Sequence, residues 1–385
     1  MRFFIIMALG LGLFTGVVTG QESADAPPDE VSFFMTFVPN VQFSPMYVAE
    51  AKGYFADSGL SVSNEHGDEP VGVDLIAAGE RDFGLVSGEQ VLAARANGRP
   101  VVSVYEWFQQ YPVGVVYPEG VGIQAVPDLA GRNVSIPGRF GASYSGLTAL
   151  LAANGMTEQN IDLEEVGYNA PEVFCAGGVE ASVIYVNNEP IQIGHRAEQG
   201  DCGDVTSVSV FRVADVVDMV SNGVVTSEAM VTDHPELVRR LVAAFDAGLR
   251  DVIRNPAEAY LLSADFVERL PLSAELRAAL EAAAAEQTAF LEATPDASRE
   301  EIAARRAALL ESLQGAFPSE ELVQFEVLLS TIDLWDADRL GYAEPESWAT
   351  TQDILLEMGY IPRASDPDTA FTNDFLPEQA ITPGS

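Results

Sequence analysis

The chain has 385 residues, of which 48% are hydrophobic; this length fits two lobes or domains, and this apolar content excludes wholesale disorder. Lys and Arg number 20 against 58 Asp and Glu, which gives a formal net charge of -38. A surface this acidic repels phosphate backbones and anionic membranes, so nucleic acid is excluded as a partner.

The N-terminus is typical of a secretory signal. Arg2 is followed by an apolar run from Phe3 to about Val18, and small residues precede Gln21. We expect residues 1–20 to be a cleaved signal peptide, because the apolar run is short for a membrane span of about 20 residues. The mature protein is therefore expected to be soluble and to act in the periplasm or outside the cell.

The first predicted unit covers residues 31–118, where short apolar runs alternate with helical segments. Strands are expected at 31–38, 60–63, 83–87, 101–105 and 113–117. Helices are expected at 44–52, with Pro45 in the first turn, and at 74–79 and 89–97. Because strands alternate with helices, the pattern predicts an α/β lobe with a sheet of parallel type.

Residues 119–221 repeat this alternation and form a second predicted α/β lobe. Its strands are expected at 133–136, 161–166, 183–186, 205–213 and 217–220, with a tight turn at 137–143 and a helix at 144–154. From about residue 225 the chain is predicted to be mostly helical, at 235–253, 276–313 and 344–358. Residues 366–385 form a Pro-containing tail, which could dock on the rest of the protein through Phe371 and Phe375.

The two cysteines, Cys175 and Cys202, are 27 positions apart. In an oxidising compartment a disulfide between them is chemically allowed. Two buried thiols are the alternative. A zinc site is disfavoured, since His195 lies nearby but no fourth ligand follows.

One segment carries a family resemblance. Residues 39–55 read PNVQFSPMYVAEAKGYF and are followed by Gly59 and Leu60. This opening resembles the thiamine-pyrimidine-synthase-like family of substrate-binding proteins of ABC importers, and later segments follow in the family's order. Residues 186–190 and 371–375 are similar to the riboflavin-binding branch in particular. The Cys pair and the helices at 271–318 depart from the family pattern.

The resemblance implies a type II periplasmic-binding-protein fold, in which two α/β lobes enclose a ligand cleft. Residues 31–118 and 222–365 would then form lobe 1, with a helical insertion at about 271–318, and residues 119–221 would form lobe 2. It also implies a monomer that takes up a small molecule and docks on the permease and ATPase subunits of an importer. Riboflavin is the favoured ligand; a thiamine pyrimidine precursor and a sulfonate are the alternatives.

Loops directly after strands supply the candidate ligand-binding residues, because ligands of such sheets bind at the carboxyl ends of strands. The candidates are Asn40, Phe43, Tyr47, Ser87, Glu89, Trp107, Arg139, Phe140, Ser143, Tyr144, Tyr168, Asn169, Tyr185, Asn187, Asn188 and Glu189. Rings and amides together suit a flat heteroaromatic ligand. Trp107 and Phe108 would face opposite ways on a strand, and Trp107 is preferred for the cleft.

Several of these residues have a structural alternative. Asn40 could cap the following helix, Tyr47 could belong to the core, and the turn around Gly138 could be plain backbone geometry. Arg139 could pair with an anionic ligand or be solvated.

Catalysis is not expected. The three histidines, His66, His195 and His234, lie far apart in the sequence, and no clustered Cys motif, Ser-His-Asp arrangement, metal motif or phosphate loop is found. No cofactor and no metal are therefore predicted. The alternatives are a secreted sensory or structural protein without an importer and, less favoured, a pyrimidine-synthase-like enzyme.

Overall fold

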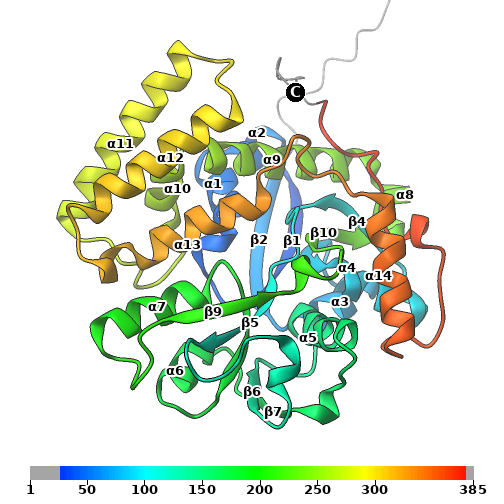
Figure 1. Ribbon diagram of the computed structural model, residues 1–385. Helices are drawn as coiled ribbons and strands as arrows, with labels where there is room; N and C mark the ends of the chain where they lie inside the picture. Colours follow the sequence, from blue (N-terminus) through cyan, green and yellow to red (C-terminus); the bar gives the residue numbers. More distant parts are fainter. Residues whose placement is uncertain (1–26, 379–385) are drawn as a thin grey trace, which may run out of the picture.

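A computed structural model describes residues 27–378, so the predicted signal peptide at 1–20 and the last residues of the tail lie outside the described residues. Two lobes are built on two separate five-stranded sheets, each covered by helices (Figure 1). Within the described part of the chain, no helix is long and apolar enough to cross a membrane.

The sheet of the first lobe has the strand order β2-β1-β3-β10-β4. Its strands are β1 (Asp29–Thr36), β2 (Leu60–Gly67), β3 (Phe83–Ser87), β4 (Val101–Glu106) and β10 (Asn222–Ser227). β1 pairs in parallel with β2 and β3, whereas β10 runs antiparallel between β3 and β4. The chain therefore leaves this sheet after β4 and returns to it as β10.

The sheet of the second lobe has the strand order β7-β6-β8-β5-β9. Its strands are β5 (Val113–Pro118), β6 (Asn133–Ile136), β7 (Asp162–Glu165), β8 (Ala181–Tyr185) and β9 (Val208–Arg212). β5 pairs with β8 and β9, although the sequence-based boundary at 118 placed it in the first lobe. Both β4 and β5 are short, Val-rich and almost entirely buried, and such a run does not reveal which sheet it joins. The 217–220 strand does not form.

Helices of the first lobe pack on both faces of its sheet. They are α1 (Ser44–Ala51), α2 (Tyr54–Asp57), α3 (Glu69–Ala77), α4 (Gly88–Ala96), α8 (Glu228–Asp233), α9 (Pro235–Arg254) and α10 (Pro256–Ser263), with the 3-10 turn η1 (Val41–Phe43). The apolar stripe of α9, including Val238, Leu241 and Phe245, is fully buried. α9 crosses α1 so closely that a side chain at Gly248 would overlap the carbonyl of Pro45.

In the second lobe, α5 (Gly141–Ala153), α6 (Ala170–Cys175) and α7 (Glu189–Gln199) cover the sheet, with the 3-10 turns η2 (Val126–Leu129), η3 (Glu158–Asn160) and η4 (Val213–Asp215). α5 begins three residues before the expected start at residue 144. Cys175, at the end of α6, forms a disulfide with Cys202, after α7, which confirms the first of the three options for this pair. Cys202 is buried.

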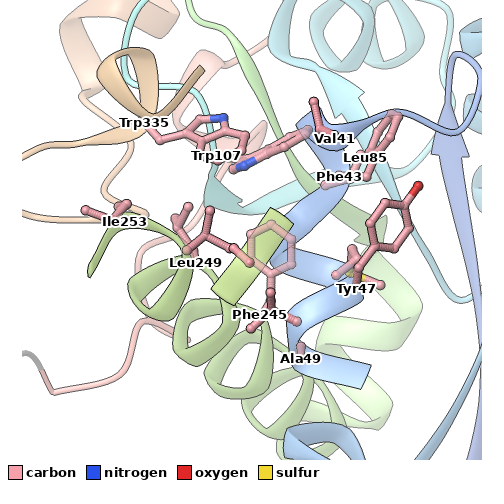
Figure 2. Packing of buried hydrophobic residues seen from close by; sticks show 14 of the residues in the cluster. Val41, Phe43, Tyr47, Ala49, Leu85, Trp107, Phe245, Leu249, Ile253 and Trp335 are labelled. Carbon is pink, nitrogen blue, oxygen red and sulfur yellow. The ribbon is translucent and has the colours of Figure 1, made fainter. Parts of the chain in front are cut away.

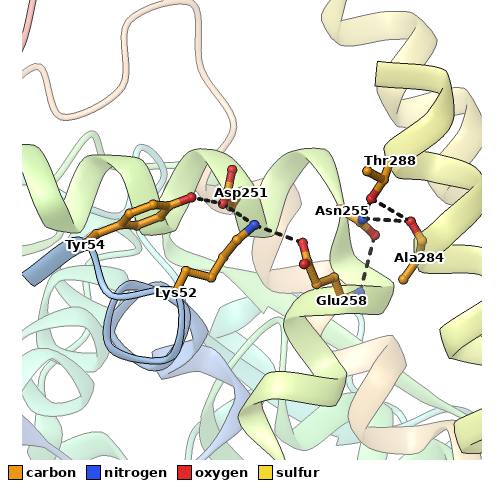
Figure 3. Close-up of polar contacts among 7 residues, drawn as sticks. All are labelled: Lys52, Tyr54, Asp251, Asn255, Glu258, Ala284 and Thr288. Carbon is orange, nitrogen blue, oxygen red and sulfur yellow. Dashed lines mark hydrogen bonds and ion pairs between the residues drawn. The ribbon is translucent and has the colours of Figure 1, made fainter. Parts of the chain in front are cut away.

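Four long helices follow α10: α11 (Ala274–Ala293), α12 (Arg299–Gln314), α13 (Ser319–Trp335) and α14 (Pro345–Glu357). α11 and α12 form a hairpin at the upper left of Figure 1, in the segment expected as a helical insertion. Asn255, between α9 and α10, holds the hairpin through its Nδ2 atom, which lies 3.1 Å from the carbonyl oxygen of Ala284 and 3.2 Å from Oγ1 of Thr288 (Figure 3). Lys52 nearby pairs with Asp251 and Glu258.

The first lobe's core continues into α13. Trp335 stacks on Trp107 with ring centroids 5.4 Å apart, and Phe43 lies beside the same ring (Figure 2). After α14 and the 3-10 turn η5 (Pro367–Thr369), the chain docks back on this lobe. Phe371 stacks on Trp348 at 5.2 Å, and Phe375 is buried. Both aromatic residues of the tail are therefore packed.

Candidate functional site

A pocket of about 880 Å³, including the part open to solvent, lies between the two lobes. The first lobe and the connection after it contribute Thr36, Phe37, Gln42, Phe43, Glu69, Trp107, Phe108 and Asn222. The second lobe contributes Pro137, Phe140, Gly141, Ala142, Ser143, Gly167, Tyr168, Ala170, Val183, Ile184, Tyr185, Asn188 and Glu189. Most of these residues follow the ends of strands, where the topology rule places ligands.

Aromatic rings line this pocket from both lobes. Phe43 and Trp107 stand on the first lobe, and their ring centroids are 5.9 Å apart. Across the cleft, Tyr168 meets Phe37 edge-on with centroids 4.6 Å apart. Because the back of Trp107 is supported by Trp335, this wall is rigid and apolar.

Both Trp107 and Phe108 line the pocket, which corrects the expectation that only one of them would do so. That expectation rested on the alternation of side chains along a strand. However, β4 ends at Glu106, and the two aromatic residues lie in the irregular connection that crosses to the second lobe. Their rings pack edge-on at 4.7 Å instead of pointing apart.

Asn188 and Glu189 provide polar groups at the end of β8. Asn188 donates from Nδ2 to Oε1 of Glu189 at 3.1 Å and accepts at Oδ1 from Gln192 at 2.7 Å. The other carboxyl oxygen of Glu189 accepts from the backbone N–H of Tyr185 at 2.9 Å. Burial raises the pKa of Glu189 to about 7. The pair thus offers a fixed amide and a buried carboxyl group.

Glu69 lines the pocket but was not among the predicted site residues. It lies in the first turn of α3, directly after β2, which extends four residues beyond its expected end at 63. Its Oε1 accepts from the N–H and the hydroxyl of Ser87, both at 2.6 Å, and its Oε2 accepts from the N–H of Ala142 at 3.3 Å. Burial raises the pKa of Glu69, while these hydrogen bonds act in the opposite direction. Glu69 directly follows a strand only when β2 is extended to Gly67, and the polar residues 64–67 did not indicate that extension.

Three further contacts join the lobes around the pocket. Asn187 donates from Nδ2 to Oε1 of Gln42 at 2.8 Å and lies 2.7 Å from Oγ1 of Thr331. The hydroxyl of Tyr168 donates to Asp68 at 3.0 Å. His195 on α7 pairs with Glu326 on α13 at 2.6 Å, and Glu326 raises the pKa of His195. The two lobes are therefore in direct contact in this structure.

Of the sixteen predicted residues, Phe43, Trp107, Phe140, Ser143, Tyr168, Tyr185, Asn188 and Glu189 line the pocket together. Ser87, Glu89 and Asn187 stand behind its wall. Ser87 binds Glu69, and Glu89 accepts from the hydroxyl of Tyr111 at 3.2 Å. Burial raises the pKa of Glu89 to about 8. These three support the site without lining it.

Asn40 and Tyr47 take the structural roles that were the alternative for each. Asn40 accepts from the N–H of Gln42 at 3.0 Å, so its side chain caps η1. Tyr47 is buried in the core of the first lobe (Figure 2), and its ring stacks on that of Phe266 with centroids 4.7 Å apart. Neither residue lines the pocket: Tyr47 faces the lobe's own interior, whereas Asn40 lines an adjoining groove that shares Tyr168 and Asn188 with the pocket.

Arg139 and Tyr144 lie away from the pocket, and Asn169 lines only the adjoining groove. Arg139 points outward and pairs with Glu158 at 2.9 Å and with Glu165, and the hydroxyl of Tyr144 donates to Glu158 at 2.7 Å. Asn169 bonds to the carbonyl oxygen of Val166 in its own loop. Acidic neighbours on the second lobe thus hold Arg139, the one cation among the candidates. Among residues 27–378, no group of three or more His, Cys, Asp or Glu is placed to hold a metal ion.

Comparisons with known proteins identify the family of this chain and its relatives. A model of the family described as NMT1/THI5 like matches residues 40–259, more than half of the chain. The riboflavin-binding protein RibY of Chloroflexus aurantiacus is 31% identical over 364 residues, covering 93% of this chain and 90% of that protein. A 4-amino-5-hydroxymethyl-2-methylpyrimidine phosphate synthase of Saccharomyces cerevisiae is 26% identical over 63% of this chain and 72% of its own length.

Solved structures share the fold at low identity. The alkanesulfonate-binding protein SsuA from Xanthomonas axonopodis pv. citri has a TM-score of 0.59 at 14% identity, covering 90% of this chain and 99% of that chain. The periplasmic nitrate-binding protein NrtA from Synechocystis has a TM-score of 0.57 at 14% identity, covering 90% and 87%. Since the family model matches more than half of the chain, the protein belongs to the NMT1/THI5-like family and has the two-lobed fold of periplasmic binding proteins.

Proposed function

We propose that the protein is the extracytoplasmic solute-binding component of an ABC importer and that its solute is riboflavin. The observation that carries this proposal is the composition of the pocket: rings from both lobes line it, and no Lys, Arg or His is among its lining residues. Such a pocket suits a flat, uncharged heteroaromatic ring that stacks on aromatic side chains and is read along its edge by amides.

The polar lining groups match the rim of such a ligand. Asn188, Asn222 and Gln42 bring amide groups to the pocket from three different elements. Amides donate and accept hydrogen bonds, so they can pair with the ring nitrogens, carbonyls and hydroxyls of an uncharged vitamin.

A sulfonate is a poor ligand for this pocket. Arg139, the cation that could have paired with one, is turned outward and bound to Glu158 and Glu165. The two charged side chains that do line the pocket, Glu69 and Glu189, are both acidic. A buried anion without a cationic partner pays a large desolvation cost. A thiamine pyrimidine precursor without a phosphate group is the second candidate, because it is also planar and aromatic.

Uptake, not conversion, is the proposed role. The relative RibY is named as a riboflavin-binding protein and aligns with nearly the whole chain, whereas the synthases align with 63% or less. No His lies among the lining residues. Closure of the two lobes on the ligand would present a fixed surface to the permease. The ATPase would then drive transport through the permease. A cleaved signal at 1–20 would deliver the protein, as a soluble monomer, to the periplasm or the outside of the cell.

Titration of the mature protein with riboflavin tests the proposal, because flavin fluorescence changes on stacking. Phe140→Ala removes a ring that lines the pocket, and we expect a loss of roughly tenfold in affinity. Its neighbour gives a matched control: Arg139→Ala should bind like the parent protein, since Arg139 faces away. Hydroxymethylpyrimidine, thiamine and taurine serve as competitors. Failure of riboflavin to bind, or equal effects of both substitutions, would contradict this site.

A further inference from the structure

We propose that Glu69 determines the specificity of the pocket: from the first lobe, its carboxyl group fills the position at the N-terminus of α5 where an anionic group of a ligand would bind. This inference rests on the proposed function, since it concerns the same pocket. It assigns to Glu69 the exclusion of sulfate, sulfonate and phosphate groups, and it makes the occupied position a latent anion subsite.

The N-terminus of α5 faces the pocket. Phe140, which precedes the helix, and its first residues Gly141, Ala142 and Ser143 are all lining residues. The first N–H groups of a helix have no partner within the helix, and together with the helix dipole they attract anions. The residue before the helix, Phe140, has no side chain that could cap these groups. Without another acceptor, this 13-residue helix would offer its N-terminus to the ligand.

Glu69 supplies that acceptor from across the cleft. Its Oε2 lies 3.3 Å from the backbone nitrogen of Ala142, in the first turn of α5. Its Oε1 is held at 2.6 Å by both the N–H and the hydroxyl of Ser87, so the carboxyl group is fixed from its own lobe as well. The residue is 8% exposed, which leaves little of it to water. All three hydrogen bonds are donated to the carboxyl oxygens.

Gly141 lies directly against the same carboxyl group. A Cβ atom at this position would overlap Oε2 of Glu69, so a larger residue would require the end of the Glu69 side chain to shift. The backbone of Gly141 also has a φ of +64°, which favours glycine. The close approach of Glu69 and the absence of a side chain at residue 141 therefore belong together.

No lining group offsets the acidic character of this position. Glu189 is the other charged lining residue, and Arg139, two residues before Gly141, is held outside by acidic side chains. An anionic ligand would have to displace the carboxyl group of Glu69 and then remain near it. An uncharged ligand meets neither obstacle.

The test uses two substitutions and a matched control. Glu69→Ala vacates the position, Glu69→Gln removes its charge but keeps its length, and Glu80→Gln changes an exposed carboxyl of the same lobe that does not line the pocket. Sulfate and methanesulfonate are titrated by thermal shift against chloride at equal ionic strength, after circular dichroism has shown that each variant is folded. Riboflavin is titrated in parallel with all four proteins.

We expect the parent protein and Glu80→Gln to show no preference for sulfate over chloride. Glu69→Ala should gain roughly tenfold or more in sulfate affinity, and Glu69→Gln should gain less. If Glu69→Ala does not fold, Glu69→Gln decides alone. Sulfate affinity equal to that of the parent in every folded Glu69 variant would overturn the inference. Riboflavin binding is a separate readout: its absence from the parent would contradict the proposed function while leaving the sulfate result standing.

Discussion

The Nδ2 atom of Asn187 lies 2.8 Å from Oε1 of Gln42, and this buried contact joins the two lobes beside the ligand pocket. Asn187 follows β8 in the second lobe, whereas Gln42 belongs to η1 in the first lobe and lines the pocket. Thr331 on α13 also lies within hydrogen-bond distance of the same Asn187 atom, at 2.7 Å. The amide of Asn187 can therefore keep both contacts only while the two lobes are together.

Removing this amide should weaken ligand binding by favouring separated lobes. Asn187→Ala leaves Gln42 without its partner in the closed form, at a cost of about 1–3 kcal/mol, so riboflavin affinity should fall roughly tenfold. Flavin titration measures the loss, and small-angle scattering should show a larger radius of gyration. Asn169→Ala is the control, because Asn169 is exposed and bonds within its own loop. Equal affinity for the parent and Asn187→Ala would contradict this role.

Stability should decrease as the pH rises from weakly acidic to weakly alkaline values. Burial raises the pKa of Glu89 to about 8 from the ordinary value of 4.5. The folded state therefore holds a proton that the unfolded state releases, and the stability from Glu89 is present below pH 4.5 and lost as the pH rises through 8. Glu106, with its pKa also raised to about 8 by burial, acts in the same direction.

Glu89→Gln should flatten this dependence, because the amide cannot ionise. Urea unfolding at pH 5, 6, 7 and 8 measures it, and the parent protein should lose at least about 1 kcal/mol more than the variant across this window. Glu119→Gln is the control, since Glu119 is solvated and hydrogen bonds from Ser207 and Ser209 lower its pKa. A parent protein whose stability rises with pH over this interval, in parallel with Glu89→Gln, would refute the prediction.

The disulfide between Cys175 and Cys202 should stabilise the second lobe. It closes a loop of 27 positions around α7, and in the chain-entropy account a loop of this length is worth about 3.5 kcal/mol. The double variant Cys175→Ser/Cys202→Ser should unfold at lower urea concentration. A reducing agent should lower the midpoint of the parent protein and leave that of the double variant unchanged. If the reducing agent does not move the parent's midpoint, the bond contributes nothing.

The sequence predicted the fold, and eight of the sixteen residues predicted for the site line the pocket. Strand ends found from short apolar runs led to Phe140, Tyr185, Asn188 and Glu189, since such ends meet at the cleft. The sequence-based prediction failed for residues whose side-chain direction depends on tertiary contacts. Arg139, for example, turns outward because Glu158 and Glu165 lie there, and neither is near it in the sequence.

Glu69 was missed for a related reason. The polar residues 64–67 gave no sign that β2 continues, yet β1 pairs with all of them through its backbone. Backbone pairing does not depend on apolar side chains, so the strand end lies later than hydropathy places it. Similarly, β5 joins the second sheet through pairing with β8 and β9, which no local pattern records.

Wild-type protein should distinguish riboflavin from its phosphate ester, flavin mononucleotide. The ring system is the same in both, so any difference reports on the phosphate group. The lining residues Glu69 and Glu189 are acidic and no cation accompanies them, while the chain as a whole has a formal net charge of -38. We therefore expect flavin mononucleotide to bind at least about tenfold more weakly.

Fluorescence titration at two salt concentrations measures this ratio. Salt screens long-range repulsion but does not screen exclusion within the pocket, so the two salt concentrations separate these effects. Equal affinity for the two flavins at both salt concentrations would mean that the phosphate lies in solvent, clear of Glu69.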